Sequence, residues 1–482
     1  MNKLALILIY IMTIYNAKAD LAGHEKGIHE NQIQQQVSVS NNVDDKWWLT
    51  ASPIVRIQLV RDQRTVKDYT NELPKLAQAG IKIIDLYAPY HGGVQYGGLD
   101  PIDYFSPRSG STFEDIRNFI KTAHSLGMKV VSFINLGYSA TNYPDWIKAC
   151  NDMKNGVQSR ERDMFVWSDK SNQNRSLERP FAPWFQQDNS NDGGWVFSEE
   201  AGKYFYARWW GAGGNVKLPQ FQFASQVWQD ECVRIIRFWR DIGFDGFIVD
   251  AVNWYTGCDW TINYNAIIKP AFENGELFMQ PEGGGGNGDD PVYWMTMGKY
   301  SCVQDYSLNA SWSNTDVIGD CFNSGEASAL WPILETYRNR VVAVGGVTYL
   351  GLGSGRNFRR TNEHLKFEAA LLVAIGEMIA LNLRSWENME NSAEFTKVFN
   401  LQNSHAALAP AGKRKLIKTD GMPASIYAVQ CIDEKSGKNI DAIFNFGTTA
   451  YTYNVAGRSV TVASMKYAFV LSSNGEVIYQ TF

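Results

Sequence analysis

The stretch Gly243-Phe244-Asp245-Gly246-Phe247-Ile248-Val249-Asp250-Ala251-Val252 has the pattern of a helix end, a buried strand and a carboxylate. Gly243 ends an amphipathic segment, the apolar run from Phe247 follows, and Asp250 stands at its end. In a barrel of alternating strands and helices, the residues that carry chemistry gather at the C-terminal ends of the strands. A carboxylate is costly to bury there unless it is paired or used. Asp250 is therefore the first candidate for a catalytic group.

The composition is that of a globular protein with an acidic balance. The chain has 482 residues, of which 45% are hydrophobic and 20% charged, and its net charge is −5. This length suits one large domain with a smaller one, and the charge argues against a nucleic-acid partner. Trp and Tyr are numerous, at 16 and 23. They suit sugar binding, because flat rings match the apolar faces of pyranoses, although large core aromatics are the alternative.

The N-terminus has the pattern of a secretory signal peptide. Lys3 precedes an apolar run from Leu4 to Tyr15, and Ala17-Lys18-Ala19 is a small-x-small cleavage site. We expect residues 1–19 to be removed, residues 20–47 to form a flexible leader, and the mature protein to be secreted or periplasmic. The apolar run is too short to span a membrane, so we expect no membrane span.

Six cysteines lie far apart in the sequence, without a CxxC pair. This spacing excludes the usual zinc site, whereas export permits disulfides. Cys302–Cys321 is the disulfide to test first. Cys232 lies on the apolar face of a predicted helix, so we expect it to be buried and free.

Short apolar strands alternate with amphipathic helices over residues 48–390, which is typical of a parallel α/β fold. The expected strands are Ile54–Val60, Ile83–Tyr87, Lys129–Asn135, the run before Asp250, Leu277–Glu282, Tyr300–Gln304, Val341–Val344 and one within Ala370–Leu383. Residues 142–222 are irregular and rich in Trp, Asn, Asp and Gly, and we expect them to form an inserted subdomain over the barrel mouth. Residues 391–482 change to short strands, which predicts a C-terminal β-sandwich.

Glu282 ends the next expected strand after Asp250. Two carboxylates on adjacent strands are what a retaining glycosidase needs, with one attacking the anomeric carbon and the other protonating the leaving oxygen from about 5–5.5 Å away. Adjacent parallel strands lie about 4.8 Å apart, which is compatible with that spacing. The alternative is that each carboxylate merely ends a strand and caps a helix.

Over roughly residues 50 to 480 the sequence resembles the α-amylase family of glycoside hydrolases. Asp245–Val252 is similar to the nucleophile motif of that family, DGFRxDA, and Glu282 matches its general acid/base. The other segments that match in order are Asp103-Tyr104-Phe105, Gly110-Ser111-Thr112 with Glu114-Asp115, Ala123–Val130, Leu218–Gln222, His405–Leu408 and Asn445-Phe446-Gly447. The resemblance implies a (β/α)8 TIM barrel with an insert after strand three and a C-terminal all-β domain. It also implies that Asp250 is the nucleophile.

The chain departs from this family at several polar positions. Ile248 replaces the arginine that precedes the nucleophile, and Asn253-Trp254 replaces a Lys-His pair. The strand-three Asp, Asn and His match Phe133, Gly137 and Tyr138, the sugar-stacking Tyr matches Leu99, and the segment Gly345–Tyr349 offers no third acid. Because the strand-three Asn usually binds calcium, we expect no calcium there, and we expect no other metal or cofactor. Asp289 and Asp290 fit a solvated loop better than a metal site.

The missing groups define the candidates that replace them. An adjacent cation lowers the pKa of a carboxyl, so another group must keep Asp250 ionised, and His91, Arg56 and Tyr87 are the candidates. Asp305, after strand six, is a candidate for the third acid, with a surface Asp that caps a turn as the alternative. The candidates for substrate binding are Tyr87, His91, Tyr138, Trp209, Trp210, Asn253 and Trp254, although Tyr138, Trp254 and one of the tryptophans 209 and 210 could equally pack in the core.

The hypothesis is a secreted retaining glycoside hydrolase that cleaves an α-linked oligo- or polysaccharide other than plain starch. Its substrate should differ from starch because lost polar groups leave sugar hydroxyls unpaired, and a site that reads hydroxyls discriminates strongly. One alternative is a transglycosidase that uses the same carboxylates. The other is a non-catalytic carbohydrate-binding protein on a decayed scaffold, against which the survival of both Asp250 and Glu282 argues.

Overall fold

The computed structural model describes residues 46–59, 64–169, 193–208, 217–252, 255, 257–259, 261–272, 277–284, 290–310, 315–355, 357–387 and 392–481. All of them belong to one compact unit, Asp45–Phe482. The expected signal peptide, nearly all of the leader and the candidates Trp209, Trp210, Asn253 and Trp254 lie outside these residues. Within these ranges, every helix is too short or too polar to cross a bilayer.

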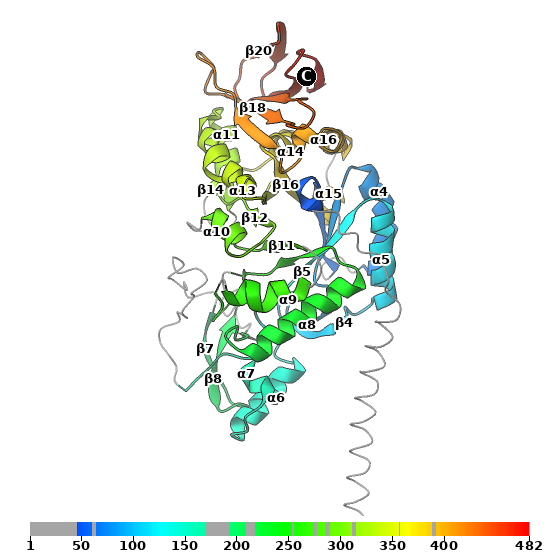
Figure 1. Ribbon diagram of the computed structural model, residues 1–482, viewed down its shortest axis with the longest axis vertical. Helices are drawn as coiled ribbons and strands as arrows, with labels where there is room; N and C mark the ends of the chain where they lie inside the picture. Colours follow the sequence, from blue (N-terminus) through cyan, green and yellow to red (C-terminus); the bar gives the residue numbers. More distant parts are fainter. Residues whose placement is uncertain are drawn as a thin grey trace, which may run out of the picture. The chain divides into compact units, whose positions relative to one another are not determined.

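Eight parallel strands form one sheet whose neighbours follow the order of the chain. They are β1 (Ile54–Ile57), β2 (Ile83–Leu86), β5 (Lys129–Ile134), β10 (Gly246–Val249), β11 (Phe278–Pro281), β12 (Cys302–Gln304), β15 (Val347–Gly351) and β16 (Glu377–Asn382). The Ser301 amide donates to the Met279 carbonyl at 2.8 Å and joins β12 to β11. This contact brings the two edge strands together, so the (β/α)8 barrel expected from the sequence is confirmed (Figure 1).

The strands are short and apolar because both of their faces are covered. Every residue of β2, β10 and β11 is buried, as expected of parallel strands inside a layer of helices. Thr112 and Asp115 form a capping box that starts α5 (Phe113–Ser125). The next long helix, α8 (Gln226–Ile242), ends at Gly243, whose φ of 127° would strain any other residue. This stop delivers the chain into β10 and so to Asp250.

The remaining helices connect the strands or follow the last of them. They are α3 (Val66–Thr70), α4 (Leu73–Gln78), α9 (Lys269–Phe272), α10 (Pro291–Thr296), α11 (Val317–Ser324), α12 (Trp331–Ile333), α13 (Asn339–Ala343), α14 (Asn362–Ile375), α15 (Leu383–Glu387) and α16 (Ser392–Ser404). In Figure 1, α14 and α16 lie next to each other, and they also contact in the structure.

The segment after β5 forms a small α+β insert. Its elements are α6 (Pro144–Lys154), α7 (Arg160–Asp163), β6 (Trp167–Ser168), β7 (Gly193–Ser198), β8 (Lys203–Arg208) and β9 (Leu218–Pro219). The Trp146 ring stacks on Trp167 with centroids 5.0 Å apart and also contacts Phe205. These aromatics therefore form a core of the insert and do not line an open sugar cleft.

The C-terminal part is all-β from Lys413 onward. Its strands are β17 (Lys413–Leu416), β18 (Ile426–Ile432), β19 (Ile440–Asn445), β20 (Tyr451–Val455), β21 (Arg458–Val462), β22 (Lys466–Leu471) and β23 (Val477–Gln480). Strands β17, β18, β19, β22 and β23 form one sheet, and the hairpin of β20 and β21 packs on it through Val462, Ile426 and Val470. Residues 392–404, which the sequence analysis counted with these strands, form α16.

Two further expectations are wrong. The seventh strand is Val347–Gly351, whereas Val341 lies in α13. A short apolar run fits a helix as well as a strand, and periodicity cannot separate the two. The disulfide Cys302–Cys321 is absent, because all six cysteines are free and buried, with Cys302 inside barrel strand β12 and Cys321 on α11. Cys232 is buried and free, as expected.

Candidate active site

Asp250 and Glu282 follow adjacent barrel strands at the same level. In the pairing of β10 with β11, Val249 lies opposite Pro281. The Glu282 amide donates to the Val249 carbonyl at 2.8 Å, which extends this ladder to the catalytic candidates. Asp250 is 4% exposed and Glu282 is half-buried. The charge of Glu282 affects the pKa of Asp250, so the two carboxyl groups belong to one site.

The backbone after Asp250 turns sharply. Ala251 has a φ of 44°, a left-handed conformation that costs a residue other than glycine on the order of 1–3 kcal/mol. In this conformation the Ala251 amide donates to Glu282 Oε2 at 3.2 Å. The strained turn therefore ties the end of β10, the fourth barrel strand, to the carboxyl group of Glu282 after β11, the fifth barrel strand.

Asn135 and Tyr138 follow β5, the third barrel strand. The Tyr138 hydroxyl donates to Asp250 Oδ2 at 2.9 Å, and the ring is buried. Asn135 holds this turn, because its Oδ1 accepts from the Gly137 amide at 2.7 Å and its Nδ2 donates to the Tyr138 carbonyl at 2.8 Å. The sequence analysis proposed Tyr138 and missed Asn135, although an Asn directly after a buried strand is a common turn signal.

The pKa of Asp250 reflects its burial and its charged neighbours. Burial raises the pKa of Asp250 well above its usual value, and the charge of Glu282 raises it further. A second carboxylate nearby makes ionisation of Asp250 harder, because like charges repel in a buried site. The Tyr138 hydroxyl and the charge of Arg56 act in the opposite direction and lower the pKa of Asp250. Both favour the arrangement in which Asp250 is ionised.

Arg56 lies near the end of β1 and pairs with Asp85 on β2. Its Nε donates to Asp85 Oδ2 at 2.5 Å. The guanidinium lies over the Phe133 ring, 4.5 Å from the centroid, and 5.3 Å from the Tyr87 centroid. Because Phe133 and Tyr87 stack at 4.7 Å, a cation and two rings form one layer beside the pair. Tyr87 is also close enough for the charge of Asp250 to raise its pKa.

The insert contributes to the site as well. Asp250 lines a cavity of about 10 Å³ that is completed by Gly137, Tyr138, Arg208, Gln220, Ala251 and Tyr255. Arg208 ends β8 and Gln220 follows β9, and both side chains are buried. Neither residue could be predicted as a site candidate from the sequence, since no motif links positions so distant from the nucleophile. A cavity of this size holds about one water molecule.

His91 and Asp305 lie elsewhere. His91 is in β3 (Tyr90–Gly92), which pairs with β4 (Pro101–Pro107), and in the described part no hydrogen bond or ion pair joins it to the carboxyl pair. Gln304 lies opposite Tyr349 in the pairing of β12 with β15. The charges of Arg56 and Glu282 affect the pKa of Tyr349, so the Tyr349 side chain faces the barrel interior. Gln304 faces the same side. Asp305 follows Gln304 and faces the opposite side of the sheet.

On that opposite side Asp305 belongs to a second buried carboxyl pair. It lies close enough to Glu377 for their charges to interact, and it accepts from the Ser307 and Leu308 amides at 2.9 and 3.1 Å. Glu377 in turn accepts from the Thr348 hydroxyl at 2.6 Å. The structure therefore does not bring Asp305 to Asp250 and Glu282, as the role of third acid requires.

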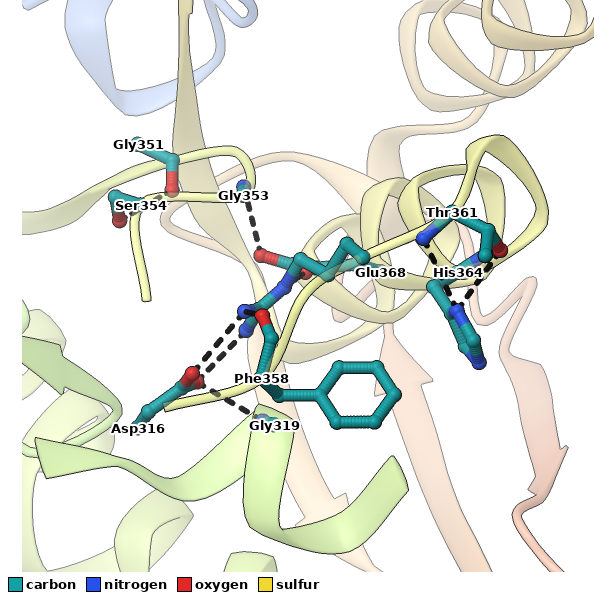
Figure 2. Close-up of polar contacts among 10 residues, drawn as sticks. Asp316, Gly319, Gly351, Gly353, Ser354, Phe358, Thr361, His364 and Glu368 are labelled. Atoms are coloured by element: carbon teal, nitrogen blue, oxygen red, sulfur yellow. Dashed lines mark hydrogen bonds and ion pairs between the residues drawn. The ribbon is translucent and has the colours of Figure 1, made fainter. Parts of the chain in front are cut away.

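The loop after β15, the seventh barrel strand, is held by a buried cluster of charged side chains. Figure 2 shows Asp316 and Glu368 on either side of this loop. Arg360 donates to both Asp316 oxygens, at 3.1 and 2.7 Å, and also to Glu368 Oε2. Glu368 Oε1 accepts from the Gly353 amide at 2.9 Å. Residues 352–361 contain no Asp or Glu, so the segment that follows the corrected strand seven also lacks the third acid of the family.

The described residues contain no group of three or more His, Cys, Asp or Glu side chains that could hold a metal ion. Asp290 caps α10 through the Val292 amide and pairs with Arg340 at 2.6 Å. Asp289 lies outside the described residues.

Comparisons with known proteins agree with this arrangement. A family model described as "Alpha amylase, catalytic domain" matches residues 70–268. "Alpha-amylase 3" of Dictyoglomus thermophilum is 26% identical over 164 residues, which are 34% of this chain and 28% of that protein. "Trehalose synthase" of Pimelobacter is 27% identical over 158 residues, which are 32% of this chain and 25% of that protein. The chain thus matches about a quarter of the length of these relatives.

The fold has the same neighbours. The crystal structure of the α-amylase from H. orenii superposes with a TM-score of 0.66 at 12% identity, covering 87% of this chain and 99% of that one. At this identity the likeness concerns the fold. The family model, the relatives and the barrel all show similarity to the α-amylase family of glycoside hydrolases.

Proposed function

We propose that the protein is a retaining glycoside hydrolase that cleaves an α-linked oligo- or polysaccharide, with Asp250 as nucleophile and Glu282 as general acid/base. The observation that carries the proposal is the placement of these two carboxyl groups directly after adjacent strands, where the Glu282 amide donates to the Val249 carbonyl at 2.8 Å and Glu282 Oε2 accepts from the Ala251 amide at 3.2 Å. An inverting enzyme separates its carboxyl groups by about 6.5–9.5 Å to admit a water molecule, so a pair this close favours the retaining mechanism.

The surroundings of the pair support this division of roles. Asp250 is buried and accepts a hydrogen bond from Tyr138, which favours its ionised form and suits a nucleophile. Glu282 is half-buried, so it can reach the glycosidic oxygen and, after the leaving group departs, water. The nucleophile attacks the anomeric carbon as Glu282 gives its proton to the leaving oxygen. Glu282 then takes a proton from the water that hydrolyses the glycosyl ester.

The substrate is proposed to differ from plain starch. Phe133 and Ile248 present apolar side chains where the family has polar ones, and the loop after strand seven supplies no carboxylate. A sugar whose hydroxyls met these groups would lose hydrogen bonds that the family normally makes, which disfavours α-1,4-glucose.

The test is covalent trapping of the nucleophile. The full chain is incubated with a panel of 2-deoxy-2-fluoro α-glycosyl fluorides, and the labelled peptide is identified by mass spectrometry. The label is expected on Asp250, to persist in Glu282→Gln with an activated fluoride, and to be absent in Asp250→Asn. Asp305→Asn is the matched control, since this carboxyl group lies on the opposite side of the sheet. Cleavage without trapping, with inversion of the anomeric centre by NMR, would contradict the retaining proposal.

Transglycosylation is a second candidate, and one observation favours it. Asp250 is nearly sealed from solvent, and the cavity beside it has room for about one water molecule. If water reaches the glycosyl intermediate poorly, a sugar acceptor can compete with it. Product analysis with and without an added acceptor sugar separates hydrolysis from transfer.

Export is proposed from the N-terminal sequence. The charged start, apolar run and small-x-small site support a signal peptide ending at Ala19. Cell fractionation and N-terminal sequencing of the protein test this, and a cytoplasmic protein that retains Met1 would contradict it.

A further inference from the structure

The two apolar residues that replace polar groups of the family lie side by side. Phe133 on β5 is directly opposite Ile248 on β10, and both are buried. The arginine before the nucleophile and the acid on strand three have therefore been replaced together by an apolar pair. Nothing on strand four now places a positive charge beside Asp250.

A positive charge reaches the same region from strand one. Arg56 lies opposite Asp85 in the pairing of β1 with β2, and its Nε donates to that carboxylate at 2.5 Å. The guanidinium lies 4.5 Å from the centroid of Phe133, one of the two replacing residues. Asp85 is anchored in turn by the Phe133 amide, which donates to Oδ1 at 2.9 Å. Both ends of the ion pair thus rest on Phe133.

This ion pair lies close enough to the catalytic pair for their charges to interact. The charge of Glu282 raises the pKa of Asp85, and the charge of Arg56 lowers the pKa of Asp250. The charges of Asp85 and neighbouring tyrosines raise the pKa of Arg56 despite its burial, so Arg56 stays protonated. The other titratable or charged groups around Asp250 are Glu282, Tyr138, Tyr87, Tyr90, Tyr255 and, across the small cavity, Arg208.

We propose that Arg56, held by Asp85 and the Phe133 ring, is the positioning residue that keeps Asp250 ionised, in place of an arginine on strand four. The inference rests on the proposed function, because Asp250 must be a carboxylate to attack a sugar. The ion pair on β1 and β2 supplies charged groups to a region where β5 and β10 present Phe133 and Ile248. It leaves Phe133 and Ile248 free to be apolar.

The test compares the pH dependence of kcat/KM among Arg56 variants, with a substrate identified from the panel above. Arg56→Met should move the acid limb of the profile upward by about one pH unit, a tenfold loss of activity below the limb. Arg56→Lys retains the charge and should keep the limb near that of the wild type. Because Arg56→Met leaves Asp85 buried without its partner, Arg56→Met/Asp85→Asn is included to keep the region neutral. The double variant should still show an upward shift, smaller than that of Arg56→Met because the negative charge of Asp85 is removed as well.

Arg64→Met is the matched control. Arg64 also combines an ion pair, with Glu387 at 3.0 Å, and a ring contact, with Tyr69 at 5.2 Å, but it lies at the surface. Its removal should leave the acid limb unchanged. A folded double variant whose acid limb coincides with that of the wild type would overturn the proposal and leave Arg56 a purely structural role.

A second readout does not require activity. The carboxyl carbon of Asp250, assigned with Asp250→Asn, is followed by NMR titration in the wild type and the double variant. An upward shift of its midpoint in the variant supports the role of Arg56, and equal midpoints refute it. If the wild type cleaves no α-glycan, the proposed function fails, while this titration still decides what Arg56 does to Asp250.

Discussion

Tyr138 shows how a single side chain tunes the candidate nucleophile. It follows β5, and its hydroxyl donates directly to Asp250. A phenol donates a hydrogen bond without adding a charge of its own. Because this bond favours the ionised carboxyl group, Tyr138 and Arg56 act in the same direction on Asp250 from different strands.

Replacing Tyr138 by Phe removes only the hydroxyl. A hydrogen bond to a charged group contributes about 1.5–3 kcal/mol, so kcat/KM is expected to fall by roughly tenfold to a hundredfold. Since the hydroxyl lowers the pKa of Asp250, its loss raises that pKa, and the acid limb of kcat/KM should move to higher pH. Tyr293→Phe, at an exposed position on α10, is the control. An unchanged pH profile in Tyr138→Phe would show that the bond is unimportant for ionisation.

At the scale of elements, buried charges fix the barrel from outside the catalytic site. Arg360 joins α14 and α11 to the loop after strand seven, through Glu368 on one side and Asp316 on the other (Figure 2). Their side chains are at most 3% exposed. A cluster so well enclosed holds the loop in one conformation, because both acidic side chains are hydrogen-bonded to the same guanidinium.

Arg360→Met should destabilise the fold. The substitution leaves Asp316 and Glu368 buried without their cation, which typically costs about 3–5 kcal/mol. We expect a lower midpoint of urea unfolding. Arg359→Met, at an exposed neighbouring position, should leave the midpoint unchanged. Equal midpoints for both variants would contradict the structural role of the cluster.

The pair Asp305–Glu377 should make stability depend on pH. Burial raises the pKa of Asp305 to about 6 and that of Glu377 well above its usual value. The folded state therefore retains protons that the unfolded chain releases above about pH 4, so the free energy of unfolding falls as the pH rises through 6. For Asp305 alone, this loss amounts to about 3 kcal/mol.

Glu377→Gln should remove much of this dependence, because the amide can donate to Asp305 at every pH. The variant is expected to be more stable than the wild type at pH 8, with the difference shrinking toward pH 5. Thermal unfolding at the two pH values measures this. Glu326→Gln, at an exposed position, is the control. A constant difference between variant and wild type across this range would contradict the assignment.

At the scale of the whole unit, the C-terminal sheet and the barrel share one hydrophobic cluster. Phe367 on α14 contacts Phe444 and Tyr467 of that sheet. Arg414 on β17 reaches into the barrel layer, where its guanidinium donates to the carbonyls of Ala374 at 2.6 Å and Ala407 at 2.7 Å. It thus satisfies carbonyl groups at the end of α14 that a helix leaves unpaired.

Arg414→Met should lower the melting temperature of the whole unit in one step. The buried carbonyls that lose their donor cost on the order of 1–3 kcal/mol each. Because the hydrophobic cluster is continuous, calorimetry should show the barrel and the sheet unfolding together. Lys415→Met, exposed on the same strand, is the control. Two separate transitions in the wild type would contradict this coupling.

The sequence by itself determined the alternation of strands and helices, the ends of α5 and α8, and the placement of Asp250 and Glu282. These features depend on local signals, such as a capping box, a glycine stop and short apolar runs before a carboxylate. Where local signals were ambiguous, the prediction was wrong. Val341 fits a helix or a strand, and only the packing of α13 against its neighbours decided it.

Only the tertiary structure decided which groups surround the carboxyl pair. Asp305 also ends a barrel strand, yet strand register turns it to the opposite side of the sheet and toward Glu377. Arg208 and Gln220 are far from Asp250 in sequence and reach it through the insert. Arg56 and Phe133 meet because neighbouring strands bring them together. Such contacts depend on how strands are placed side by side, which no local pattern in the chain records.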